Sequence, residues 1–569
     1  MATLLQSPVP SAATDAAGSW ERVREMLCVG GILLGASHKG ASAIMDEFQS
    51  SCPGAPSILN SADPNFEPAL NRHPPLHEAK RRASRRTPET ICLALYSALV
   101  AFAIAHHEPW ADEAQAWQLA RSLTPWQLLH TYLHYEGSPG LWHLFLWMLI
   151  HLGVGYTGVH WICGAIALAG TAILLYRSPF PLYLRLLLPF TFFLAFQYAV
   201  IARSYVLVPI LLFSTVALWK RNPVLLAVLL GLMANLAAHA TVMAVGMSFV
   251  YFLDGSYRRW PKQTLLAAAS VLIAACAFAL WTAYPAHDVI IVSYHPRGVA
   301  IAPLSPAVKL LVGSLRSLLF GLCDPWWLSL FFWAAVLVAM AGMRRLRFLV
   351  PVLLLAIFSG LALDSFWHLG LKFVLLLAIF WVIWDGLPAG RNRILLEAAL
   401  LFTVFTQIAW TAYSVNFERK HDYSPDLATA RFLKPYVDQG LPIASTHLLD
   451  EGVASFHSVG IEPYFHENLF INQAKPFWWW SRRNDSEERF LASLPKPAVV
   501  VAEFYGSRLL DPARDIPGEK NSLLIANGYT LRHIFCATQP ERFTWSAEVC
   551  QLIYIRNDIA DLPSTSAKF

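Results

Sequence analysis

Between residues 91 and 415 of this 569-residue chain, long apolar runs alternate with short polar segments. Both ends of the chain are more polar and lack such runs. A membrane-spanning helix needs about 20 apolar residues, and tilting or flanking residues accommodate a mismatch in length. The runs cover residues 91–105, 140–153, 157–176, 184–201, 204–219, 223–253, 264–284, 327–343, 348–363, 366–384 and 394–415. The pattern predicts an α-helical polytopic membrane protein with about 11–13 transmembrane helices.

Composition supports a membrane protein, since 56% of the residues are hydrophobic and only 14% are charged. Soluble domains are typically about 25% charged and about 45–50% apolar. Arginines and lysines at 80–86 precede the first run, and this predicts a cytoplasmic N-terminus. We therefore expect a multi-pass protein of the cell inner (plasma) membrane. The soluble part contains no block of basic residues of the kind that would indicate nucleic acid as a partner.

Three regions follow from this pattern. Residues 1–86 are rich in Ser, Ala and Pro without a sustained period, and we expect a disordered cytoplasmic extension. Residues 87–415 form the transmembrane domain, with a first outer loop at 106–139. Residues 416–569 predict an extracytoplasmic α/β domain, with a helix at 427–437 and strands at 442–445, 498–502, 531–536 and 549–555.

Eight cysteines are scattered along the chain, and they form no CxxC motif or Cys/His cluster that would indicate a structural zinc site. Cys536 and Cys550 lie in the C-terminal region. If that region is outside the cytoplasm, these two cysteines could form a disulfide.

The first outer loop carries an adjacent acid pair, Asp112 and Glu113, directly after the first apolar run. Spacing predicts two short amphipathic helices in the membrane interface, separated at Thr124-Pro125. Carboxylates at a membrane face are costly unless they are solvated or used. A structural alternative is that Asp112 caps the helix, with Gln115 completing a capping box. Adjacent side chains on a helix point about 100° apart, so the two acids cannot share one role.

The order of these features resembles the GT-C superfamily of membrane glycosyltransferases, which includes protein O-mannosyltransferases and lipid A aminoarabinose transferases. A basic flank and a first span are followed by Asp-Glu in the first outer loop, and residues 137–141 (Gly-Ser-Pro-Gly-Leu) open the second span. The family commonly has two prolines there, and Gly140 replaces one of them. The resemblance implies a polyprenyl-phosphate sugar as donor, Asp112 as the catalytic base and Glu113 as its neighbour. The acceptor, which could be a lipid, a glycan or a protein, is not specified.

Three basic or ionisable residues at membrane depth are candidates for binding the donor phosphate. Arg203, in an Arg-Ser-Tyr stretch, could form bidentate hydrogen bonds, or it could be a positive loop anchor. His239 lies within an apolar run, where an ionisable residue is either functional or packed and hydrogen-bonded. Lys372 lies where members of the superfamily place a basic residue near the lipid phosphate, and its alternative is to snorkel to the interface.

No metal ligand is assigned from the sequence. His287, Asp288 and His295 share an outer loop, but two histidines eight residues apart on an irregular loop are weak evidence for a metal site. Members of the superfamily differ in whether they bind a divalent metal ion, so this cofactor is left open.

The sequence therefore predicts a glycosyltransferase that acts on the extracytoplasmic face. The alternative is a transporter or flippase of a lipid-linked or polar solute, with His239 and Arg203 as binding groups within the membrane. An inverted repeat would favour that alternative, and inspection of the sequence reveals none.

Overall fold

The structure is a computed structural model of the full chain, and it describes residues 86–289, 306–361, 366–447, 456–481, 496–506, 522–542 and 545–560. The chain divides into the units Met1–Ala79 and Lys80–Phe569, and all described residues belong to the second. The predicted disordered extension therefore lies almost wholly outside the described residues.

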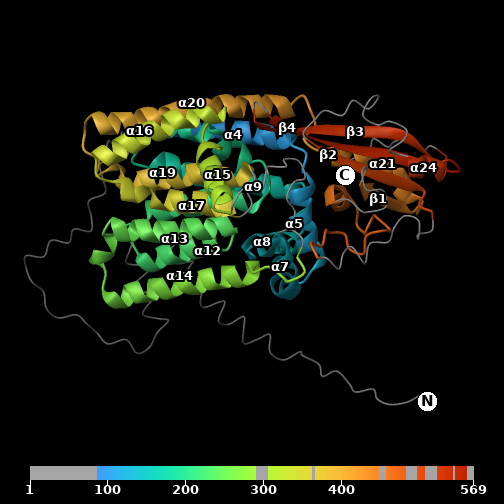
Figure 1. Ribbon diagram of the computed structural model, residues 1–569, viewed down its shortest axis with the longest axis horizontal. Coiled ribbons are helices and arrows are strands. Elements are labelled where there is room, and N and C mark those ends of the chain that lie inside the picture. The colour runs from blue at the N-terminus through green and yellow to red at the C-terminus, as the bar shows by residue number, and fades with distance from the viewer. Residues whose placement is uncertain are drawn as a thin grey trace, which may run out of the picture. The chain divides into compact units, whose positions relative to one another are not determined.

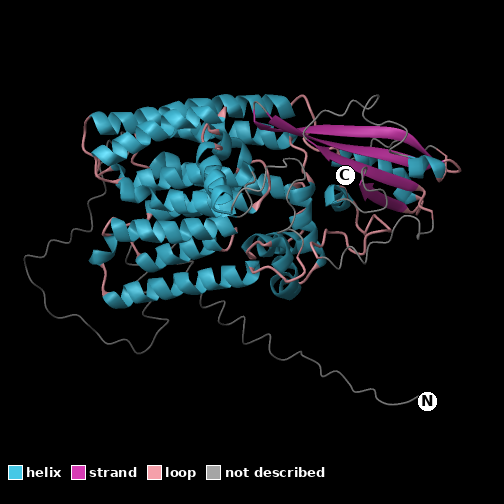
Figure 2. Cartoon of the chain, viewed as in Figure 1, coloured by secondary structure: helices cyan, strands magenta, loops and turns pink. Residues whose placement is uncertain are grey.

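Helices dominate the described residues, and strands occur only in the C-terminal region (Figures 1 and 2). Among the described residues, five helices are long and apolar enough to cross a membrane. They are α4 (Thr87–His106), α9 (Gly158–Arg177), α14 (Lys262–Ala283), the segment Trp367–Trp384 made by α18 (Phe366–Leu369) and α19 (Leu371–Trp384), and α20 (Arg391–Glu418).

Shorter apolar helices occupy most of the other predicted runs. They are α8 (Leu141–His151), η5 with α11 (Ser204–Val206 and Leu207–Ala217), α12 (Pro223–Ala234), α13 (Ala238–Leu253), α16 (Ser329–Gly342) and α17 (Val350–Leu361). A further short apolar helix, α15 (Pro306–Leu319), lies outside the predicted runs. The run 223–253 is broken between α12 and α13. The predicted total of 11–13 spans stays a prediction.

The run 184–201 does not form one continuous helix, unlike the single run that the pattern indicates. It contains α10 (Leu182–Leu187), a 3-10 turn (Leu188–Phe190) and a π-helical turn (Phe193–Gln197). Pro189 lacks a backbone N–H and interrupts the regular helical hydrogen bonds there.

Two helices show how the apolar residues are distributed. The segment Trp367–Trp384 is mostly apolar, and 83% of it is buried, as expected of a helix at the centre of a bundle. Only 6% of α14 is buried, and Leu266 and Ile273 are each 67% exposed. An exposed apolar helix of this length is typical of a surface that contacts lipid.

The loop after α4 folds into two helical segments, as the sequence predicts. The first is α5 (Ala111–Ser122), and the second runs through α6 (Pro125–Gln127), η2 (Leu128–Tyr132) and α7 (Leu133–Glu136). Thr124 caps the second segment by accepting a hydrogen bond from the Gln127 backbone N at 3.3 Å. Gly137 ends this segment in a left-handed conformation with φ 59°.

The C-terminal region contains the predicted helix and all four predicted strands. Helix α21 (Asp426–Asp438) precedes a sheet of order β1-β2-β4-β3, whose strands are β1 (Ile443–His447), β2 (Val499–Gly506), β3 (Tyr529–Arg542) and β4 (Trp545–Arg556). Strands β1 and β2 are parallel, and the other two pairs are antiparallel. Helix α21 packs on one face of the sheet, and α24 (Ser522–Ala526) packs on the other. A sheet covered on both faces explains the continuous apolar run of β2.

The predicted pairing of Cys536 and Cys550 is confirmed, because the two residues face each other on β3 and β4 and form a disulfide.

Candidate functional site

The acid pair lies in the first turn of α5, which begins at Ala111 after an extended Trp110. Acidic side chains are favoured there by the partial positive charge of the helix N-terminus. The Glu113 carboxylate turns back and accepts a hydrogen bond from the Trp110 backbone N at 3.2 Å. The alternative in which Asp112 caps this helix is therefore wrong, since Trp110 occupies the cap position and Glu113 completes the first turn.

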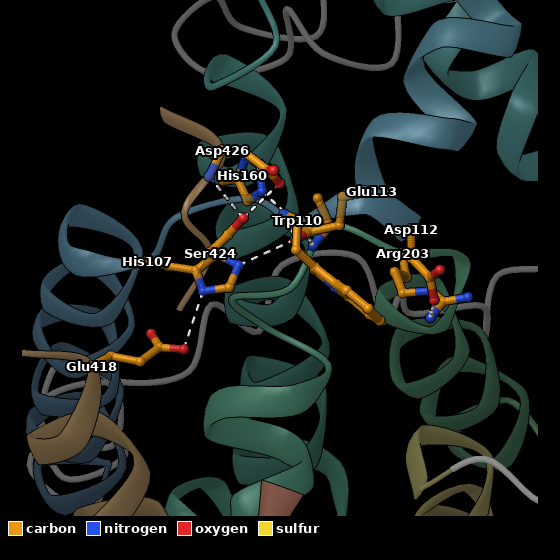
Figure 3. A network of polar contacts seen from close by, with 10 residues as sticks. His107, Trp110, Asp112, Glu113, His160, Arg203, Glu418, Ser424 and Asp426 are labelled. Atoms are coloured by element: carbon orange, nitrogen blue, oxygen red, sulfur yellow. Dashed lines mark hydrogen bonds and ion pairs between the residues drawn. The ribbon is translucent and has the colours of Figure 1, made fainter. Parts of the chain in front are cut away.

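Glu113 lies at the centre of a buried hydrogen-bond network (Figure 3). Its Oε1 accepts from His107 Nε2 at 3.2 Å as well as from Trp110 N, and its Oε2 accepts from His160 Nε2 at 2.9 Å and from Ala202 N at 2.5 Å. A carboxylate has about four acceptor positions, and here each one is occupied. The Glu113 side chain is 1% exposed. This residue therefore joins the start of the loop to α9 and to residue 202, and it has no acceptor position left for a substrate.

His107 lies between two carboxylates. Its Nδ1 is 3.2 Å from Glu418 Oε1, and its Nε2 is 3.2 Å from Glu113 Oε1. Each ring nitrogen of His107 therefore lies within hydrogen-bonding distance of a carboxylate oxygen. Burial alone would lower the pKa of His107, but Glu418 and Glu113 raise it to about 10. Burial alone would raise the pKa of Glu113, but His160 and His107 hold it well below its usual range. At neutral pH the network therefore contains an imidazolium beside an ionised carboxylate.

The same residues are close enough to be considered as metal ligands, because ligand atoms of His107, Glu113 and His160 all lie within 4.8 Å of one another. A histidine that binds a metal must present an unprotonated ring nitrogen. Both ring nitrogens of His107 lie 3.2 Å from carboxylate oxygens, which also fits hydrogen bonds within the cluster. The divalent ion therefore stays an untested option.

Of the outer-loop residues considered as metal ligands, Asp288 is engaged in hydrogen bonds. It accepts from Tyr135 Oη at 2.9 Å and from Ser481 Oγ at 2.6 Å. His295 lies outside the described residues.

Asp112 points away from Glu113, as expected for neighbours on a helix (Figure 3). Its Oδ2 accepts a hydrogen bond from Arg203 Nη1 in an ion pair. Its Oδ1 has no hydrogen-bond partner within the described ranges, and the side chain is 19% exposed. Burial raises the pKa of Asp112, Arg203 lowers it, and the result is above the usual value. The acid pair is thus divided into a saturated residue and an accessible one.

The Arg203 guanidinium is held between aromatic rings. Its central carbon lies 4.8 Å from the ring centre of Trp367 and 5.7 Å from that of Tyr205. Within the described part of the chain, only Nη1 forms a hydrogen bond, so the other N–H donors remain available. The structure therefore brings together two of the residues selected from sequence, Asp112 and Arg203.

His239 is linked to this group through rings. It stacks on His368 with ring centres 4.1 Å apart, and His368 lies 5.5 Å from Tyr205, which contacts Arg203. His239 is buried, and its Nε2 has no hydrogen-bond partner among the described residues. Its binding of a donor phosphate stays a prediction.

Lys372 lies near the start of α19, and its buried side chain reaches the C-terminal end of α15. Its Nζ donates hydrogen bonds to the backbone carbonyls of Ser317 and Phe320, at the C-terminal end of α15. A positive charge is favoured at a helix C-terminus. The structure thus gives Lys372 a structural role, and its contact with a donor phosphate stays a prediction.

Sequence reasoning considered Gln115 only as a capping-box partner and did not foresee its contacts with Glu136 and Trp478. Gln115 Nε2 donates to Glu136 Oε1 and to the Trp478 carbonyl, both at 2.7 Å, and Trp478 N donates to Gln115 Oε1 at 2.8 Å. Burial raises the pKa of Glu136 to about 7. Trp478 lies 363 positions from Gln115, so local patterns could not reveal the contact. A usable signal was the position of Gln115, three residues after Asp112 and on the same helix face.

Comparison of the chain with protein-family models, with curated proteins and with solved structures gives no match.

Proposed function

We propose that this protein is an integral membrane glycosyltransferase that moves a sugar from a polyprenyl-phosphate donor to an acceptor on the extracytoplasmic face. The observation that carries the proposal is the pairing of Asp112, which keeps an open carboxylate oxygen, with Arg203, which keeps free N–H donors. A base and an anion-binding group side by side are what transfer from a sugar phosphate requires.

In the proposed reaction, an acceptor hydroxyl attacks the anomeric carbon of the donor. The new bond joins the acceptor oxygen to that carbon, and the bond from the carbon to the phosphate oxygen breaks. Asp112 Oδ1 takes the hydroxyl proton, and the polyprenyl phosphate leaves with the electron pair. Arg203 stabilises the charge that develops on the leaving phosphate, because its planar donors match phosphate oxygens. Glu113 holds the helix that carries Asp112.

The extracytoplasmic placement is supported by the disulfide between Cys536 and Cys550. Disulfides form and persist in oxidising compartments and are rare in the cytosol. The basic segment before α4 supports a cytoplasmic N-terminus. One crossing by α4 would then place the loop with Asp112 on the outer face, on the same side as the C-terminal sheet.

The test is transfer of labelled sugar from a panel of polyprenyl-phosphate donors in membranes that contain wild type or Asp112→Asn. We expect transfer by wild type and a loss of about 100-fold or more in the variant, since removal of a general base costs about 10²–10⁴-fold. Asp385→Asn makes the same chemical change at an exposed position and should retain activity. Equal transfer by wild type and Asp112→Asn would refute the role of Asp112. No transfer by wild type with any donor would favour the transporter alternative.

A further inference from the structure

Gln115 fixes the position of a second carboxyl group beside the candidate base. Asp112 and Gln115 are three residues apart on α5 and therefore share one helix face. The buried carboxamide of Gln115 is held by the Trp478 backbone on both its oxygen and its nitrogen, and it donates to Glu136 Oε1. The Glu136 carboxyl group consequently lies on the side of α5 that carries Asp112.

Glu136 is part of the same electrostatic environment as the ion pair. Burial and, to a lesser extent, the Asp112 carboxylate raise the pKa of Glu136, while Gln115 and the Arg203 guanidinium lower it. The Glu136 side chain is only partly buried, and its Oε2 has no hydrogen-bond partner in the part of the chain that the structure describes. Two carboxylate oxygens, Asp112 Oδ1 and Glu136 Oε2, are therefore open to a ligand.

A further buried donor belongs to Trp110, two residues before Asp112. Trp110 is 5% exposed, and its indole N–H has no partner among the described residues. In Figure 3 its ring extends toward the side where Asp112 and Arg203 lie. Its ring centre is 5.7 Å from that of Trp367, the ring beneath the Arg203 guanidinium. Buried polar groups are normally hydrogen-bonded, so this N–H is available to donate to a polar ligand.

We propose that Glu136 binds the acceptor and that the acceptor is a sugar, belonging to a glycan or a glycolipid. This inference rests on the proposed function. Asp112 Oδ1 takes the proton of the attacking hydroxyl, and Glu136 Oε2 accepts a hydrogen bond from a second hydroxyl of the same sugar. A sugar offers neighbouring hydroxyls to two such oxygens, whereas a serine or threonine side chain offers one.

Gln115 is a positioning residue in this arrangement. It holds Glu136 and at the same time binds the backbone of Trp478, which belongs to the C-terminal region. Loss of its carboxamide should therefore act on acceptor use through Glu136, without contact between Gln115 and the reacting atoms.

The test measures two products from one labelled donor in native membranes that contain the full chain: sugar transferred to membrane acceptors and sugar released to water. Glu136→Gln should lower transfer about tenfold or more, since hydrogen bonds to charged groups contribute strongly. Release to water should stay within about twofold, because Asp112 and Arg203 are unchanged. Gln115→Ala should also lower the ratio of transferred sugar to released sugar. Glu467→Gln makes the same chemical change at an exposed position and should leave the ratio unchanged.

Each other outcome overturns a defined part of the reasoning. An equal fall in transfer and release, or an unchanged ratio, would overturn acceptor binding by Glu136. Label on protein that is released by β-elimination would overturn the sugar acceptor. If wild type forms neither product from any donor, the proposed function fails and the inference fails with it. If Glu136→Gln does not fold, Glu136→Asp is the second variant. It keeps the negative charge but places the carboxylate oxygens farther from the acceptor, because the side chain is shorter, and it should also lower the ratio of transferred sugar to released sugar.

Discussion

Replacing Glu113 by Gln tests whether this acid is structural, as its contacts indicate. The substitution is nearly isosteric, so it changes hydrogen bonding and charge more than packing. The single oxygen of the Gln amide can still accept the two hydrogen bonds that reach one of the two carboxylate oxygens in wild type. The amide nitrogen on the other side cannot accept, and it faces two donors that belong either to His107 and Trp110 or to His160 and Ala202.

The magnitude follows from those contacts. Two hydrogen bonds to a buried charged acceptor are lost, and each contributes about 1.5–3 kcal/mol. The His107 imidazolium also loses one of its two carboxylate partners. Removing one partner of a buried ion pair costs about 3–5 kcal/mol. We therefore expect Glu113→Gln to lower the free energy of unfolding by about 3–5 kcal/mol.

The assay is thermal unfolding of the detergent-solubilised full chain, followed by the loss of monodisperse protein on heating. Glu467→Gln, at an exposed position, is the matched control and should unfold as wild type does. The contrast with Asp112→Asn is the sharper test, because that variant should lose transfer but less stability, since the Asn oxygen can still accept the hydrogen bond from Arg203. A Glu113→Gln variant as stable as wild type would refute the structural role of this network.

Two further predictions concern the buried Asp426, which accepts hydrogen bonds from Ser424 Oγ at 2.5 Å and Gln551 Nε2 at 2.6 Å. Gly460→Ala should destabilise the protein by about 1–3 kcal/mol, because the added Cβ would lie 1.9 Å from Asp426 Oδ2; unchanged thermal unfolding would contradict this packing. Burial raises the pKa of Asp426 to about 7, so the folded state binds this proton more tightly than the unfolded state and stability falls as pH rises from about 4 to about 7. Asp426→Asn should remove that part of the pH dependence, and a parallel loss of stability from pH 5 to pH 8 in both proteins would contradict it.

The sequence predicted those parts of the fold that depend on local pattern. Apolar runs located most of the helices, and short apolar or alternating stretches located the four strands, since these signals are carried by neighbouring residues. Local pattern failed at the run 184–201, where Pro189 interrupts an otherwise apolar stretch. The run 223–253, which the pattern allows as one long or broken span, forms two shorter helices, α12 and α13.

The candidate site was only partly accessible to the same reasoning. Asp112 was selected because of a motif, and Arg203 because of its charge at membrane depth. The two residues are 91 positions apart in the sequence, and the fold brings them into contact. The roles of His160 and Glu418 in holding Glu113 and His107 were not foreseen, since each contact joins distant segments. The sequence around a single histidine in an apolar run does not indicate which carboxylate the histidine will contact.

The division of labour between the two acids follows from helix geometry combined with burial. Because neighbours on a helix diverge by about 100°, one acid of the pair can face the interior while the other faces an opening. The inward acid, Glu113, gains enough hydrogen bonds from His107, His160 and two backbone N–H groups to remain ionised in a buried position. The hydrogen bonds of Glu113 also fix the backbone at Asp112, the preceding residue. Asp112 is therefore held in position while its own Oδ1 stays open. An exposed acid on a flexible loop would lack this orientation, and an acid buried alone would be protonated and unable to act as a base.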